Sequence, residues 1–246
     1  MPTLEQLAES TAVHLLPQPG YEKLVTEQFT YIAGPNNAWV LDVVEPDVDW
    51  ARDESRRREL PLVEWWIGWS SAAGLADELL RRGLVPDDEP VLTGMTCTTE
   101  PPPAPDVEVR PLETAEQYLA AVMVDWDVWD VPEAERERRR LTEVDRFEAA
   151  QASGTVHHWA AYDGQEPVGF GRAIDMSEGV ALMGGAVLPA ARGRGVYRAL
   201  VHARWVHAAA RGTPLLVVQA GRMSAPILAS LGFESHGEIR LYADRL

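Results

Sequence analysis

The stretch that decides the fold is Val187-Leu188-Pro189-Ala190-Ala191-Arg192-Gly193-Arg194-Gly195-Val196-Tyr197-Arg198-Ala199-Leu200. An apolar strand ends at Leu188, Pro189 stops it, and a glycine-rich turn then opens a helix. Such a junction gathers unpaired backbone N–H groups and the positive end of a helix dipole at one point. The stretch therefore predicts an anion-binding site.

The glycines and arginines of this turn indicate which anion fits. Gly193 and Gly195 remove side chains that would keep a diphosphate away, while Arg192 and Arg194 add charge-assisted donors at the rim. The dinucleotide pattern G-x-G-x-x-G fails because Arg198 stands at the third glycine, and no G-x-x-x-x-G-K-[ST] occurs. A solvent-exposed loop that only caps a helix remains the alternative.

Strands and helices are expected to alternate around this junction. Asp163-Gly164 is a strong signal for a hairpin turn, and Gly212 is placed to end the helix after the glycine turn. That helix carries an apolar stripe made of Val196, Ala199, Leu200, Ala203, Val206 and Ala210. Strands are expected at 107–110, 155–162, 167–175, 180–188, 214–219 and 238–242, and further helices at 113–127, 133–152 and 224–231. This βααβββαβαβ order predicts a mixed α/β sheet.

A proline run, Pro101-Pro102-Pro103-Ala104-Pro105, marks the clearest boundary, because it fits neither a helix nor a central strand. Upstream of it, an apolar strand at 61–69, a helix at 72–82 and Gly83-Leu84 repeat the layout of 214–219, 224–231 and Gly232-Phe233. In this comparison Leu79 falls opposite Leu228. We therefore expect a duplicated unit, although strand–helix–glycine patterns also recur by accident.

Composition narrows the class of protein. The 246 residues carry a net charge of -16, which argues against nucleic acid or an anionic membrane as a partner. No apolar run is long enough to span a membrane, so we expect a cytoplasmic protein. The single cysteine, Cys97, agrees with a reducing compartment and is expected to be a small buried residue rather than a catalytic thiol.

The glycine turn resembles the phosphate-loop signature of the GCN5-related N-acetyltransferases (GNAT), Q/R-x-x-G-x-G/A. Arg192 to Tyr197 match it except at the last position, where Tyr197 replaces Gly or Ala. The element order and the segment Ser230-Leu231-Gly232-Phe233 are also similar to that family. The resemblance implies a mixed, mostly antiparallel sheet flanked by helices, the acyl-CoA N-acyltransferase fold, with a tandem arrangement as an option. It divides the chain into a degenerate GNAT-like domain (1–100), a linker (101–105) and an acetyltransferase domain (106–246).

The resemblance also implies acetyl-CoA as co-substrate, bound between two splayed strands. Pantetheine would pair with the backbone of Ala186, Val187 and Leu188, and the pyrophosphate would lie on Arg192, Gly193, Arg194, Gly195, Val196 and Tyr197. A backbone N–H near Val187 or Leu188 would polarise the thioester carbonyl. Gly184-Gly185 interrupts this strand, which indicates either a bulge that opens the gap or a pair of packing glycines.

The general acid and base are harder to assign. The register of a tyrosine acid common in the family falls on Leu228. Ser224 lies one turn earlier, and either its hydroxyl substitutes for the tyrosine or it serves as a helix N-cap. Glu178 is a candidate base, as is one of His157 and His158, which point to opposite faces of a strand.

The sequence also offers candidate residues for the acceptor site and a test for a metal site. Asp125, Trp126 and Trp129 lie where the helix at 113–127 joins the helix at 133–152. They would hold an ammonium group by charge and ring-face attraction, or else pack in the core. The acceptor would be a small-molecule or peptide amine. His202 and His207 have no evident metal partner in the sequence, so no metal is expected. A homodimer, and a non-catalytic acyl-CoA-binding module of the same fold, remain open.

Overall fold

The computed structural model describes residues 2–10, 20–104 and 106–246 of the chain. They form two compact units, one of Met1–Thr96 with Val218–Leu246 and one of Cys97–Val217. The last 29 residues thus belong by contact to the first unit, whereas the sequence-based boundary places them with 106–246. The functional boundaries 1–100, 101–105 and 106–246 stay a prediction, and Pro105 lies outside the described residues.

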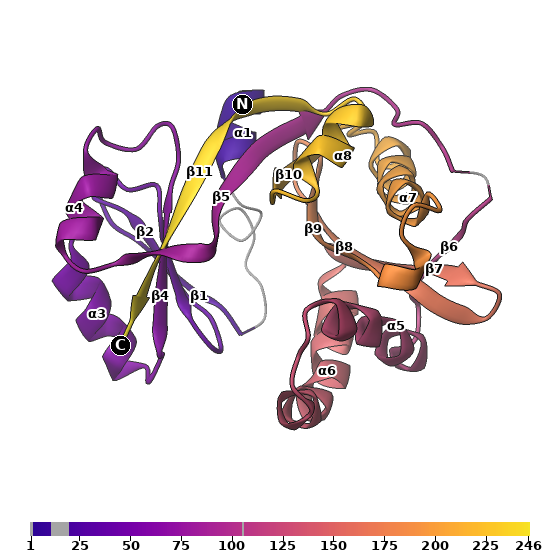
Figure 1. The fold of residues 1–246 in the computed structure, drawn as a ribbon, viewed down its shortest axis with the longest axis horizontal. Coiled ribbons are helices and arrows are strands. Elements are labelled where there is room, and N and C mark those ends of the chain that lie inside the picture. Colours follow the sequence, from indigo (N-terminus) through magenta and orange to yellow (C-terminus); the bar gives the residue numbers. More distant parts are fainter. Residues whose placement is uncertain (1, 11–19, 105) are drawn as a thin grey trace. The chain divides into compact units, whose positions relative to one another are not determined.

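The second unit and the chain that follows it have the predicted order of elements (Figure 1). Its sheet has the order β10-β9-β8-β7-β6, and all pairs are antiparallel except β10 with β9. Figure 1 shows α7 on one face of this sheet and α5 with α6 on the other. The elements are β6 (Glu108–Pro111), α5 (Ala115–Val128), α6 (Glu133–Ser153), β7 (Val156–Asp163), β8 (Glu166–Asp175), β9 (Val180–Val187), α7 (Val196–Ala210) and β10 (Leu216–Ala220).

Local signals explain most of these boundaries. Thr114 and Gln117 form a capping box at the start of α5. Gly164 has a φ of 64° in the two-residue turn between β7 and β8, where Asp163 pairs with Glu166. Gly212, at φ 78°, follows α7 and ends it, as the sequence predicts.

The buried face of α7 differs from the predicted apolar stripe. Val206 is 51% exposed and Ala210 is exposed, so neither lies on the packed face. That face includes Leu200, Arg204 and Ala208, which follow each other at intervals of four, and Arg204 is only 1% exposed. Because successive residues turn by about 100°, Val206 lies about 200° around the helix from Arg204. The apolar pattern misplaced the stripe because a charged residue occupies its centre.

The strands of the first unit follow the order β1-β2-β3-β4-β11-β5 (Figure 1). The C-terminal strand β11 lies between β4 and β5 and is antiparallel to both. The elements are α1 (Leu4–Glu9), β1 (Glu22–Val25), β2 (Thr30–Ala33), β3 (Ala38–Leu41), α3 (Val48–Arg57), β4 (Leu62–Ile67), α4 (Leu75–Arg81), β5 (Val85–Cys97), α8 (Ala225–Ser230) and β11 (Glu234–Arg245).

The two halves of the chain repeat one topology. In each, two antiparallel hairpin pairs (β1-β2-β3 and β7-β8-β9) lead through one helix to a parallel strand, β4 or β10. The next helices, α4 and α8, end alike: Leu84 N–H donates to the Leu79 carbonyl at 3.1 Å, and Phe233 N–H donates to the Leu228 carbonyl at 3.1 Å. Leu79 and Leu228 are both fully buried.

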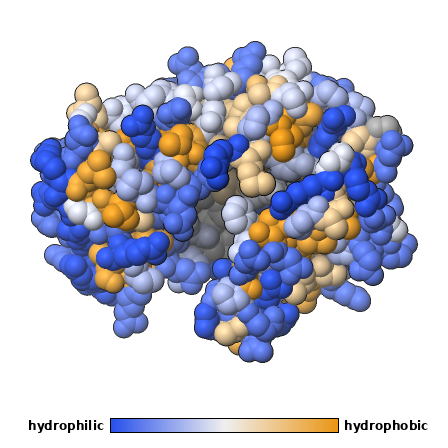
Figure 2. All heavy atoms as spheres, in the orientation of Figure 1, coloured by the Kyte–Doolittle hydropathy of each residue, from blue (hydrophilic) through white to orange (hydrophobic). Residues whose placement is uncertain are grey.

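Hydrophilic residues cover most of the face seen in Figure 2, with apolar residues in separate groups. The atoms at the place of α6 are mostly hydrophilic, as expected for a helix with several Arg–Glu pairs along it. Among the described helices, none combines the length and the apolar character that crossing a bilayer requires.

We predict that Glu64 on β4 makes stability pH-dependent. Burial and the nearby charge of Asp87 raise the pKa of Glu64 to about 7, although Asn37 donates a hydrogen bond to its carboxylate. A raised pKa means that the folded protein binds the proton on Glu64 more tightly than the unfolded chain does. The contribution of protonated Glu64 to folding stability is therefore complete below pH 4.5 and is lost as the pH rises through about 7. Urea unfolding of Glu64→Gln should show a smaller loss of stability between pH 5 and pH 8 than the parent protein, and identical pH profiles would contradict this.

Candidate functional site

The predicted anion site is a glycine turn between β9 and α7. Pro189 begins a short 3-10 turn (Pro189–Ala191), after which Gly193 and Gly195 have φ values of 77° and 84°. Only glycine adopts this left-handed backbone region readily, so these two residues define the shape of the turn. Gly195 is the N-cap of α7, and no side chain accepts a hydrogen bond from the helix start.

The start of α7 is therefore open toward the turn. The first backbone bond at this end runs from the Ala199 N–H to the Gly195 carbonyl at 2.9 Å. Amides ahead of Ala199, such as those of Val196 and Arg198, have no carbonyl one turn earlier within the helix. Together with the helix dipole they favour a bound anion.

The two arginines of the turn have different partners. Arg192 is exposed, and its Nε donates to the Val187 carbonyl at 3.2 Å, which braces the turn against the end of β9. Arg194 pairs with Asp163 of β7 at 2.7 Å, and its guanidinium lowers the pKa of that carboxyl. An anion at the turn would share Arg194 with Asp163.

The N–H groups of β9 point alternately to its two edges, and this decides which of them can donate to a ligand. The Leu188 N–H donates to the Val168 carbonyl of β8 at 3.0 Å, so it does not serve as the donor to a thioester. Because successive peptide groups of a strand point to opposite edges, the N–H groups of Gly185 and Val187 point away from β8. On that edge the recorded pairing with β10 is at Val180 and Ala181.

Gly184 and Gly185 perform both of the roles that the sequence left open. Gly184 has a φ of 65° and lies at the register shift between β8 and β9, which marks a β-bulge. Gly185 is a packing glycine, since a Cβ there would lie 2.8 Å from the Tyr197 ring. Tyr197 is half-buried, and its ring packs on Gly185 of β9.

Residues 121–233, which include the whole turn, match the acetyltransferase (GNAT) family. The chain contains a GNAT acetyltransferase domain. It therefore carries a domain of an acyltransferase family, and the β9–α7 turn lies inside it.

Solved structures show that the GNAT fold extends beyond this domain. A GCN5-related N-acetyltransferase from Kribbella flavida has a TM-score of 0.68 at 14% identity, covering 99% of this chain and 96% of that one. One from Sphaerobacter thermophilus has a TM-score of 0.63 at 15% identity, covering 90% and 82%. A tandem GNAT protein from the clavulanic acid biosynthesis pathway has 0.60 at 14%, covering 99% and 88%. No curated protein matches the sequence.

The two catalytic candidates, Glu178 and Ser224, belong to other segments than the glycine turn between β9 and α7. Glu178 belongs to the turn between β8 and β9, where the Ser177 hydroxyl donates to it at 2.5 Å. Gly184 is six residues further along the chain, about 20 Å in extended backbone, which argues against Glu178 as a base at the bulge. Ser224 belongs to the first unit, and its hydroxyl donates to the Gly221 carbonyl at 3.2 Å rather than capping α8.

The three acceptor candidates at the end of α5 divide into two groups. Trp126 is 1% exposed and packs in the core, so it offers no ring face to a ligand. Trp129 is 69% exposed, and its Nε1 donates to Asp125 Oδ1 at 3.2 Å. Burial raises the pKa of Asp125, against the effect of this hydrogen bond.

The neighbouring histidines point to opposite faces of β7, as predicted. His158 is buried among the rings of Tyr118, Phe147 and Phe170, and burial lowers its pKa to about 3, so it is neutral at physiological pH. Its enclosure leaves it unsuited to contact an acceptor. His157 lies on the other face.

His157 belongs to a cluster that the sequence did not predict. It bonds Asp175 at 3.0 Å, and His207 bonds the same carboxylate at 2.8 Å. His207 thus lies beside Asp175 and His157, an arrangement that the spacing of these residues along the chain does not indicate. Ligand atoms of the three lie within 4.8 Å of one another, but Arg211 also pairs with Asp175 at 3.0 Å, and its charge disfavours a divalent cation there. His202 pairs instead with Glu100.

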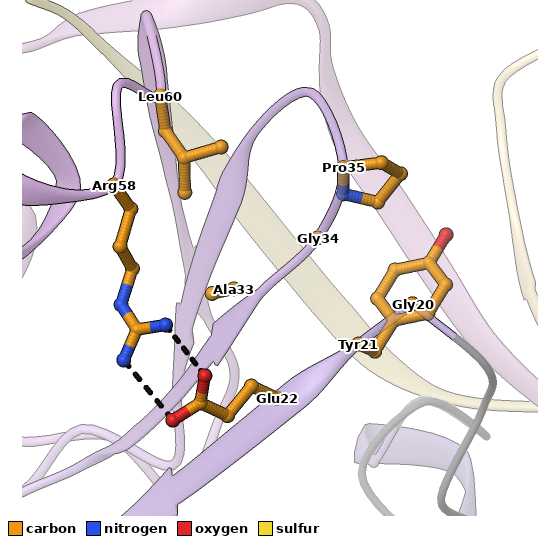
Figure 3. Close-up of a pocket in the computed structure, with 8 residues that line it drawn as sticks. All are labelled: Gly20, Tyr21, Glu22, Ala33, Gly34, Pro35, Arg58 and Leu60. Carbon is orange, nitrogen blue, oxygen red and sulfur yellow. Dashed lines mark hydrogen bonds and ion pairs between the residues drawn. The ribbon is translucent and has the colours of Figure 1, made fainter.

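A separate hollow lies in the first unit (Figure 3). It measures about 340 Å³, and Arg58 and Glu22 form an ion pair in its wall. Tyr21, Gly34, Pro35 and Leu60 line it further. Its charged groups already satisfy each other, and none of the sequence-predicted site residues lies in it.

We predict that the turn binds inorganic pyrophosphate and that Gly195→Glu abolishes this binding, because the added carboxylate repels the anion. Gly212→Glu, at the other end of α7, is a matched control, since Gly212 also has positive φ and open space for a Cβ. Titration followed by amide NMR should show binding in the control only. Equal pyrophosphate affinity in the two folded variants would contradict an anion site at the turn.

Proposed function

We propose that the chain transfers an acetyl group from acetyl-CoA directly to a primary amine. The observation that carries this proposal is the open, glycine-capped start of α7 within a GNAT domain, which suits the CoA pyrophosphate. In the reaction the amine nitrogen attacks the thioester carbonyl carbon. The C–N bond forms, the C–S bond breaks, and the CoA thiolate takes up the proton that the amine releases.

The edge of β9 supports the binding of the rest of the co-substrate. The Val187 N–H points away from β8, and we assign it the role of donor to the thioester oxygen in place of Leu188. Pantetheine would follow the same edge along Ala186 to Leu188, starting from a pyrophosphate on Arg192 to Tyr197. No metal is needed for this transfer, because a backbone amide stabilises the developing charge.

Asp125 and Trp129 are the side chains that we propose for the acceptor. The exposed Trp129 ring and the Asp125 carboxylate bond each other and together suit an ammonium group of a small molecule or a peptide. Trp126 takes no part, because it is buried. His158 is enclosed and Glu178 is distant along β9, so we give neither the role of general base.

A non-catalytic acyl-CoA-binding module is the second candidate function. One observation favours it: Leu228, in the register of the family's tyrosine acid, is a fully buried leucine with no proton to donate. The hydroxyl of Ser224, one turn earlier, donates to the Gly221 carbonyl.

Release of free thiol separates the two functions. We expect acetyl-CoA with a panel of amines to yield CoA thiol at a rate that depends on the amine, and we expect Asp125→Asn to raise KM for the amine about tenfold while CoA affinity stays constant. Asp127→Asn is the control, because Asp127 lies two residues from Asp125 but is exposed and pairs with Arg136. CoA binding without thiol release for any amine would establish the binding module instead.

We also predict one CoA bound per chain, because the matching helix start in the first unit is closed. Asp47 caps α3 by accepting a hydrogen bond from the Trp50 N–H at 3.0 Å, and Asp49 adds a further acid in the first turn. The segment from Asp42 to Asp47 contains no glycine and would repel a diphosphate. Calorimetry should give a stoichiometry near one, and a value near two would show that the first unit also binds CoA.

A further inference from the structure

Arg204 of α7 is the most deeply buried charged side chain of the second unit's described residues. It is 1% exposed, and burial lowers its pKa to about 10, so it remains a cation at neutral pH. Its Nε donates to the Leu200 carbonyl at 2.9 Å. Its Nη2 has no hydrogen-bond partner among the described residues, and no carboxylate there forms an ion pair with it.

The remaining nitrogen of Arg204 is placed at the β-bulge. Nη1 donates to the Gly184 carbonyl of β9 at 3.1 Å and to the Arg172 carbonyl of β8 at 3.3 Å. The guanidinium also lies against Gly171, where a Cβ would be 3.3 Å from its Cζ. The register between β8 and β9 shifts at this point, between Gly171 and Arg172.

Two carbonyl oxygens that a regular ladder would pair with amides thus share one arginine. A bulge interrupts the ladder and leaves such groups without partners. An unpaired buried carbonyl is costly because it has lost its hydrogen bond to water, and two facing carbonyls also repel each other. Arg204 relieves both problems with a single nitrogen.

The orientation of one peptide group follows from this contact. The peptide between Gly184 and Gly185 is trans, so its C=O and N–H point in opposite directions. Since the Gly184 carbonyl faces Arg204, the Gly185 N–H faces the opposite way, toward the edge of β9 away from β8. This is the edge on which the Val187 N–H also lies.

We propose that Arg204 is a positioning residue that locks the Gly184–Gly185 peptide at the bulge and so holds the amides along the outer edge of β9 in place for the thioester. This inference rests on the proposed acetyl transfer. The arginine touches no substrate, and it acts through the backbone it binds. A bond from a cation to the Gly184 carbonyl also polarises the peptide, which strengthens the Gly185 N–H as a donor.

The test compares Arg204→Met, which removes the charge and the donors, with Arg204→Lys, which keeps a charge on a single donor nitrogen. Arg211→Met is the matched control, because Arg211 is the C-cap residue of the same helix and also bonds carbonyls, those of Gly179 and Met176, near the far end of β9. CoA affinity is measured by calorimetry, kcat and KM by thiol release, and the Gly185 amide by its NMR resonance and hydrogen exchange.

For Arg204→Met we expect kcat to fall about 10- to 100-fold, CoA affinity to change less than about threefold, and the Gly185 amide resonance to shift. Arg204→Lys should recover part of kcat, and Arg211→Met should change neither kcat nor the Gly185 amide. An unchanged Gly185 amide and kcat in folded Arg204→Met overturns the proposal, as does an equal loss in Arg211→Met.

Failure of the proposed function has a different signature. If the parent protein releases no thiol with any amine, acetyl transfer is refuted, and the Gly185 amide alone decides the role of Arg204: a shift in Arg204→Met supports it, and no shift overturns it. If Arg204→Met does not fold, Arg204→Lys carries the same measurements, and an unchanged amide and kcat in that variant then overturns the proposal.

Discussion

The constraint on which the second unit depends is the packing of α7 against the sheet of β7, β8 and β9. This single helix has its start at the glycine turn, its middle at the bulge and its end at the His157–Asp175–His207 cluster. Gly195 has no side chain, so no side-chain cap bond closes the start of α7. A helix with a serine or aspartate at this position would have closed its own end and lost the anion site.

The first unit shows what that alternative looks like. It repeats the topology of two hairpin pairs, a crossover helix and a parallel strand, and its α4 ends with the same hydrogen bond as α8. Yet its crossover helix α3 begins with Asp47, which fills the helix start with its own carboxylate. Of the two crossover helices α3 and α7, only α7 therefore begins with a glycine and without a side-chain cap. Fold and site are separate properties, and the site depends on a few residues at one turn.

The sequence predicted the parts of this structure that depend on local signals. The order of elements from β6 to β11 follows from hydrophobic periodicity with turn glycines, and Gly193 and Gly195 predicted the turn because positive φ is specific to glycine. Long-range placement was not predictable in the same way. Nothing local indicates that β11 inserts between β4 and β5, or that Asp175 gathers His157 and His207 from different elements. Such contacts depend on register and packing between distant segments.

Arg204 is the clearest case of a residue that periodicity hides. A pattern that reads apolar residues as buried places an arginine on the solvent side of a helix, and it accordingly put Val206 on the packed face instead. The residues that indicate a buried arginine lie in the sheet instead. Gly184-Gly185 in β9 and Gly171 in β8 leave space opposite α7, and the bulge there leaves carbonyls for Arg204 to bond. An apolar side chain would fill that space but could not bond the carbonyls. A charged residue on the buried face of a helix, opposite glycines in the sheet, is therefore the pattern that would have identified the bulge and its anchor together.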